Sequence, residues 1–101
     1  MNWIDIKDFK FDRTGEVILI MSNPKKKNEL VIREDCLSYS VYEKANWWTE
    51  NALKGNVHIE EIDDKKIKYW TFSRASIKNV KAIVFKKDLL NDYLTNIENN
   101  G

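Results

Sequence analysis

The sequence predicts an α+β fold, an antiparallel β-meander sheet with one central helix and a C-terminal helix packed on it. Short β-branched and aromatic segments separated by turn residues occupy most of the chain up to position 85. A helical apolar period follows at the C-terminus. With 43% hydrophobic residues in 101 positions, the chain can build one core but not two, so we expect a single domain over residues 1–101.

The first strand is expected at the N-terminus. Ile4 and Ile6, and then Phe9 and Phe11, alternate with polar residues, which is typical of a half-buried strand. The alternation changes phase between the two pairs, which indicates a β-bulge near residues 7–8.

The second strand is expected to be central. A turn at 12–15 precedes residues 16–21, which are apolar on both faces and therefore predict an interior strand buried on both sides. A polar loop over 22–28 contains Pro24, which lacks an N–H donor and favours the end of the strand. Residues 30–32 predict the next strand.

The segment 37–42 alternates apolar residues with serines, which favours a strand. Ser40 and Glu43, however, have the spacing of a helix capping box. We therefore expect a short strand followed by the central helix from Val41 to Lys54, which ends at Gly55.

The remaining elements are a hairpin, a strand and a helix. Residues 57–62 and 67–72 predict a hairpin around the charged turn 63–66, and 80–85 predict another strand. Asp88 is expected to cap the last helix. The apolar stripe of that helix consists of Leu89, Leu90, Tyr93, Leu94 and Ile97.

Element order supports one alternative fold. Seven expected strands followed by one C-terminal helix is also the order of pleckstrin-homology-like β-barrels, in which the C-terminal helix caps the barrel. No sequence motif accompanies this analogy, and a fold would not determine the function.

The sequence contains no recognisable catalytic, metal or cofactor site. Cys36 is the only cysteine and follows two acids, which disfavour a reactive thiolate. His58 is the only histidine, and strand alternation predicts that it faces outward beside Glu60. The acids and lysines of 60–66 suit an exposed turn better than a nuclease metal site. We expect a protein that is not an enzyme, although acids from separate strands would leave no sequence signal.

Charge and cysteine content predict the cellular setting. No uncharged apolar run approaches the ~20 residues of a membrane helix, and charge appears too early for a signal peptide. The single cysteine favours a reducing, cytoplasmic compartment. Lysine greatly outnumbers arginine, and asparagine and isoleucine are frequent, which suggests an AT-rich bacterial or phage genome.

One stretch of the sequence is compatible with nucleic-acid binding. Residues 65–87 carry eight basic residues and no acid, interleaved with aromatic residues, although the net charge of the chain is only +1. Lys68 and Trp70 share a strand face, and Arg74 follows them. A small nucleic-acid-binding module using these three residues is the alternative function.

The favoured hypothesis is a protein that docks on another protein, as an inhibitor, immunity or anti-defence protein does. On the expected central helix Trp47 and Trp48 point ~100° apart, so only one of them can join the apolar stripe. Trp48 shares that stripe, whereas Trp47 lies among charged residues. Tryptophan is enriched at binding hot spots, so Trp47 is the expected anchor, with Lys44 and Lys54 as its polar rim.

Overall fold

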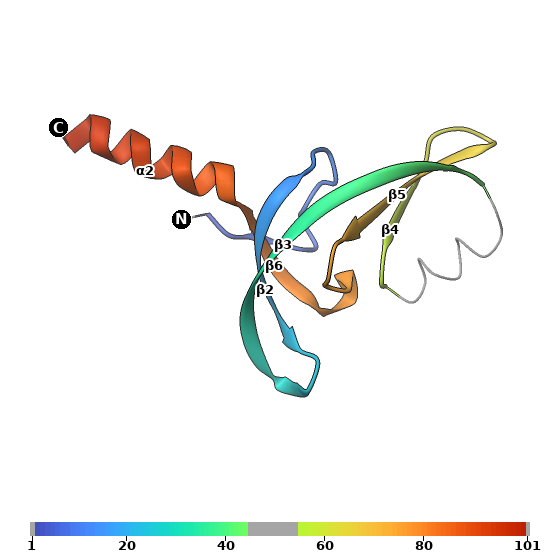
Figure 1. Cartoon of the computed structure of the whole chain (residues 1–101), viewed down its shortest axis with the longest axis horizontal. Coiled ribbons are helices and arrows are strands. Elements are labelled where there is room, and N and C mark those ends of the chain that lie inside the picture. The colour runs from blue at the N-terminus through green and yellow to red at the C-terminus, as the bar shows by residue number, and fades with distance from the viewer. Residues whose placement is uncertain (1, 45–54, 101) are drawn as a thin grey trace.

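The computed structural model of the protein describes residues 2–44 and 55–100 (Figure 1). These residues form one antiparallel sheet of six strands in the order β1-β6-β2-β3-β5-β4. The strands are β1 (Ile4–Asp5), β2 (Gly15–Asn23), β3 (Lys26–Glu43), β4 (His58–Glu61), β5 (Lys66–Phe72) and β6 (Val80–Phe85). A 3₁₀ turn η1 (Ile77–Asn79) precedes β6, and helix α2 (Lys86–Asn100) follows it directly.

Strand β2 lies in the middle of the sheet, between β3 and β6. The prediction of an interior strand over 16–21 is therefore confirmed. The expected burial of both faces is wrong, because Val17 and Leu19 are fully buried on one face whereas Ile18 and Ile20 on the other are only half-buried. We call the face that carries Val17 and Leu19 the inner face and the opposite face the outer face.

Strand β3 is a single bent strand of 18 residues (Figure 1). It pairs with β2 up to Leu37 and then with β5 over 37–43. The expected start of a helix at Val41 is wrong, because the pairing with β5 outweighs the local capping-box pattern. Residues 45–54, the rest of that expected helix, lie outside the described residues.

The loop expected over 22–28 is much shorter than predicted. Strand β2 runs to Asn23 and β3 begins at Lys26, so only a tight turn at positions 24–25 joins them. The result is a long β2–β3 hairpin that reaches beyond the rest of the sheet (Figure 1).

The hydrophobic core lies on the inner face, where the N-terminal segment covers it. Only Ile4 and Asp5 pair as a strand, so the expected strand with a bulge over 4–11 is mostly wrong. Phe9 and Phe11 instead pack on the core, with ring centroids 6.0 Å from Phe85 and 5.7 Å from Trp70, respectively. The buried cluster consists of Val17, Leu19, Met21, Leu37, Trp70, Phe72, Val80, Ile83 and Phe85.

The hairpin of β4 and β5 and the strand β6 agree with the sequence prediction. Asp63 explains the tight turn of the hairpin, because its Oδ1 accepts hydrogen bonds from the backbone N–H groups of Lys65 and Lys66, at 2.8 and 2.9 Å. This carboxylate is therefore engaged in the turn.

Helix α2 projects away from the sheet (Figure 1). It begins at Lys86, so Asp88 lies in its first turn and is not the expected cap. The expectation that the helix packs on the sheet is wrong, because the residues from Leu90 to Asn99 are exposed. The radius of gyration, 15.8 Å, exceeds the ~13 Å of a compact chain of this length, in keeping with the projecting helix and hairpin.

The described residues do not form the alternative fold, a closed pleckstrin-homology-like β-barrel, either. Strands β1 and β4 are the two ends of the sheet and do not pair with each other. Because α2 leaves the sheet, it does not cap the curved inner face (Figure 1).

Candidate docking surfaces

The structure places one of the three residues of the predicted protein-binding site. Lys44 follows β3, where its Nζ lies 2.9 Å from Glu61 Oε1 and its backbone N–H donates to the carbonyl of Lys65 at 2.7 Å. Trp47 and Lys54 lie outside the described residues. Lys44 thus holds the end of β3 to the hairpin of β4 and β5.

The structure brings together two of the three residues of the predicted nucleic-acid site. Lys68 and Trp70 share the inner face of β5, and Lys68 Nζ lies 4.6 Å from the ring centroid of Tyr39 and 5.8 Å from that of Trp70. Trp70 is only 1% exposed, so its ring packs in the core and cannot stack on a base in this structure. Arg74 lies apart from them, in the loop after β5.

The other aromatic and basic residues of 65–87 do not gather around Lys68 and Trp70. Phe72 and Phe85 are buried in the core. Lys86 Nζ pairs with Glu34 Oε2 at 3.2 Å, on a different part of the sheet. The stretch 65–87 contains no acid in the sequence, but its basic residues do not form one continuous basic surface in the fold.

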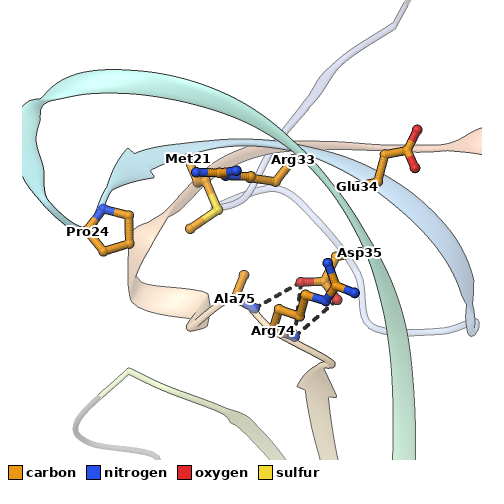
Figure 2. Close-up of a pocket in the computed structure, with 7 residues that line it drawn as sticks. All are labelled: Met21, Pro24, Arg33, Glu34, Asp35, Arg74 and Ala75. Carbon is orange, nitrogen blue, oxygen red and sulfur yellow. Dashed lines mark hydrogen bonds between the residues drawn. The ribbon is translucent and has the colours of Figure 1, made fainter.

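A pocket opens beside the loop after β5 (Figure 2). Asp35 of β3 points toward this loop, and its carboxylate accepts hydrogen bonds from the backbone N–H groups of Arg74, at 3.2 Å, and Ala75, at 2.9 Å. Asp35 Oδ1 also accepts from the N–H of Cys36 at 2.7 Å. The acid therefore fastens the loop to β3.

This pocket offers little for acid–base catalysis. Of its two acids, Asp35 is engaged by backbone N–H groups and Glu34 by Lys86. Arg33 and Arg74 line it, with Met21 among its apolar residues (Figure 2). Neither arginine forms an ion pair within the described residues. Its lining therefore mixes two acids and two arginines with apolar side chains and does not single out one class of ligand.

His58 lies where the sequence did not predict it. It sits opposite Trp70 on the inner face, half-buried, with its ring stacked on Phe11 at a centroid distance of 4.1 Å. The expectation that it faces outward is wrong, because the N-terminal segment crosses the inner face and covers β4. His58 Nε2 lies 3.3 Å from Glu60 Oε1. Among the described residues no three His, Cys, Asp or Glu side chains form a group that could hold a metal ion.

The ion pair of Arg13 and Asp88 shifts the pKa of both of its members. Arg13 donates to both carboxylate oxygens of Asp88, and its guanidinium carbon lies 3.9 Å from the ring centroid of Phe85. The hydrogen bond from Arg13 holds the pKa of Asp88 below its ordinary value. This pair joins the N-terminal segment to the start of α2, so its role is structural.

Lysines gather at the tip of the β2–β3 hairpin. Lys27 lines a depression together with Lys78 and Lys81, and no acid lines it. Lys25 and Lys26 are exposed in the same tip. None of these five lysines forms an ion pair within residues 2–44 and 55–100. We call them the lysine cluster; sequence reasoning missed it because Lys78 and Lys81 are about 50 residues from Lys27 in the chain.

An apolar patch lies on the outer face beside this cluster. Ile20 of β2 is flanked by Ile32 of β3 and Ala82 of β6 in one row across the sheet. Ile18 and Leu30 share the same face by their register. Leu30 is 60% exposed and Ile32 67% exposed. We call these five residues the outer-face patch. The continuous apolar run over 17–21 signalled two apolar faces, but not that one of them stays open.

Comparison of the chain with known protein families, with curated proteins and with solved structures finds no match. Among the described residues, no helix is both long and apolar enough to cross a membrane. Functional inference therefore depends on the chemistry of the surfaces themselves.

Proposed function

We propose that this chain is a non-enzymatic protein that docks on another protein, as an inhibitor, immunity or anti-defence protein of bacterial or phage origin does. The outer-face patch is the observation that carries the proposal. Leu30 and Ile32 keep well over half of their surface in water on a hairpin that reaches beyond the sheet. A contiguous apolar patch rimmed by charge is typical of a protein interface, because its burial removes apolar surface from water.

The lysine cluster supports a particular chemistry for the partner. Lys25 lies in the turn, and Lys26 and Lys27 begin β3, in the same hairpin that carries Leu30 and Ile32. Five lysines without an acidic partner in the described residues favour a partner surface with acids around an apolar centre. Lysine charges at the rim speed association more than they add affinity, so we expect binding that weakens moderately with salt.

Trp47 remains a predicted second contact with the partner, and Lys44 and Lys54 remain its predicted polar rim. A Trp47→Ala variant should weaken partner binding by about 2 kcal/mol or more if the tryptophan is an anchor. The patch and Trp47 belong to different segments of the chain. The patch variant and the Trp47→Ala variant therefore test the two contacts separately.

The lysine cluster also suits a nucleic acid, which is the second candidate function. Two observations favour the protein partner. The rings of Trp70, Phe72 and Phe85, which would have to stack on bases, are buried in the core. Leu30 and Ile32 offer a phosphate backbone no attraction. Binding to oligonucleotides that falls steeply with salt would support the second candidate instead.

The experiment compares a patch variant with a matched control on the same strand. In the double variant Leu30→Thr, Ile32→Thr the patch becomes polar with little loss of β-propensity. Val41→Thr makes the same kind of change on the inner face of β3, at a valine that is 49% exposed. A partner captured by wild type is identified, purified and titrated with all three proteins.

We expect the double variant to lose most of its affinity for the partner and Val41→Thr to bind like wild type. The purified partner should carry acids around its contact, and its binding should weaken as salt rises. Equal binding by the double variant and wild type, with all proteins folded by circular dichroism, would contradict the proposal.

A further inference from the structure

Helix α2 carries a second apolar surface that the described residues leave uncovered. Leu90, Tyr93, Leu94 and Ile97 follow the spacing i, i+3, i+4, i+7 and so lie on one face of the helix. They are 58%, 62%, 47% and 49% exposed. We call them the α2 stripe.

The helix itself needs a partner for its stability. It has 15 residues, and isolated helices of about 12–15 residues are marginal in water because packing supplies most of their stability. Beyond Leu89, which is half-buried, residues 90–99 are exposed. The helix projects from the sheet over this length (Figure 1). An apolar stripe on such a helix indicates that another surface covers it.

We propose that the α2 stripe is covered by the α2 stripe of a second copy of this chain, with the two helices antiparallel. In this arrangement Leu90 of one copy lies opposite Ile97 of the other, and Tyr93 lies opposite Leu94. The contact is isologous, because both copies use the same stripe and each residue pair occurs twice. Nothing in this proposal rests on the outer-face patch.

The charges of α2 select the antiparallel direction. Lys87 and Glu98 are eleven residues apart, which at ~100° per residue brings them to the same side of the stripe. In the antiparallel pair Lys87 of each copy lies near Glu98 of the other. In a parallel pair Lys87 and Glu98 would lie at opposite ends of the contact, about three turns of helix apart, so they could not meet.

The exposed area sets the strength of the dimer. From their exposed fractions, the four side chains offer on the order of 400 Å² per copy, about half of the ~800 Å² per partner of a standard interface. We therefore expect a weak, reversible dimer. The projection of α2 leaves room for a second helix along its length (Figure 1).

Sedimentation velocity of the full chain over a concentration series tests the dimer. Leu94→Lys should raise the dissociation constant about 100-fold or more, because it places two buried charges in each dimer. Thr95→Lys makes the same charge change one residue on, away from the stripe, and should dimerise like wild type. Both positions are exposed, so both variants should fold, which circular dichroism checks.

A charge exchange tests the direction. Lys87→Glu and Glu98→Lys should each weaken the dimer, and the double variant should restore it, because only the antiparallel pair faces these residues against each other. Failure of the double variant to restore the dimer would overturn the antiparallel arrangement.

Three results would overturn the proposal of a second copy. The first is a protein that stays monomeric at every concentration reached. The second is a dimer that Leu94→Lys does not weaken. The third is a monomer that binds phosphatidylglycerol vesicles in the wild type but not as Leu94→Lys, which would assign the stripe to a membrane surface.

Discussion

At the scale of residues, single carboxylates hold the irregular segments of this protein in place. Asp35 fastens the loop after β5, Asp63 closes the turn between β4 and β5, and Asp88 holds Arg13 over Phe85. Asp35 and Asp63 accept hydrogen bonds from backbone N–H groups, and Asp88 accepts them from a guanidinium. Asp63 belongs to the acids that were weighed in the sequence as a metal site, and in the fold its carboxylate closes the turn.

The pair of Arg13 and Asp88 gives a prediction about pH. The pKa of Asp88 is lowered in the folded protein, so its stabilising contribution is present above the ordinary value of 3.8 and is lost as the pH falls through the lower folded pKa. Asp88→Asn should lower the free energy of unfolding at neutral pH by about 0.2–1 kcal/mol, the range for exposed ion pairs.

Urea unfolding of wild type and Asp88→Asn across the acid range measures this difference. The two proteins should converge as the pH falls below 3.8, because wild-type Asp88 is then also becoming neutral. A difference that stays constant down to the lowest pH would show that the effect does not come from ionisation of this carboxylate.

At the scale of elements, the apolar runs and alternations of the sequence predicted three strands correctly. Residues 16–21 and 80–85 form β2 and β6, and 67–72 form most of β5. The capping-box spacing of Ser40 and Glu43 misled, because pairing of β3 with β5 comes from residues more than 20 positions away. Such long-range pairing leaves no periodic signal.

The surfaces were predictable to different degrees. The apolar stripe of α2 was evident in the sequence, but its period shows only that something covers it, not what. The lysine cluster was not predictable, because the fold alone brings Lys27 to Lys78 and Lys81. The placement of Lys68 and Trp70 on one face was predictable from strand alternation, whereas the burial of Trp70 was not.

Strand β2 gives a prediction that separates its two faces. Leu19 is fully buried on the inner face, so Leu19→Asp should prevent folding, since an unpaired buried carboxylate costs several kcal/mol. Ile18 is half-buried on the outer face, so Ile18→Asp should lower the melting temperature and still fold. Thermal melts by circular dichroism compare them. Equal loss of structure in both variants would mean that the outer face is also part of a closed core.

At the scale of the whole molecule, the two apolar surfaces lie on separate elements. The outer-face patch belongs to the sheet and its projecting hairpin, and the α2 stripe belongs to the helix (Figure 1). A dimer through α2 would therefore carry two docking hairpins. If a partner presents two matching sites within reach, this arrangement would raise the avidity without any new contact.

The most direct test of docking through the outer-face patch is a hydrogen–deuterium exchange footprint on the protein, with and without the captured partner. Backbone N–H groups that do not pair within the sheet exchange more slowly once an interface covers them, so within residues 18–32 the turn and the start of β3, whose far side β5 does not pair, should gain protection in the complex. Peptides covering β5 and the loop with Arg74 should change little. Protection confined to 65–74, with no change over 18–32, would contradict docking through the outer-face patch.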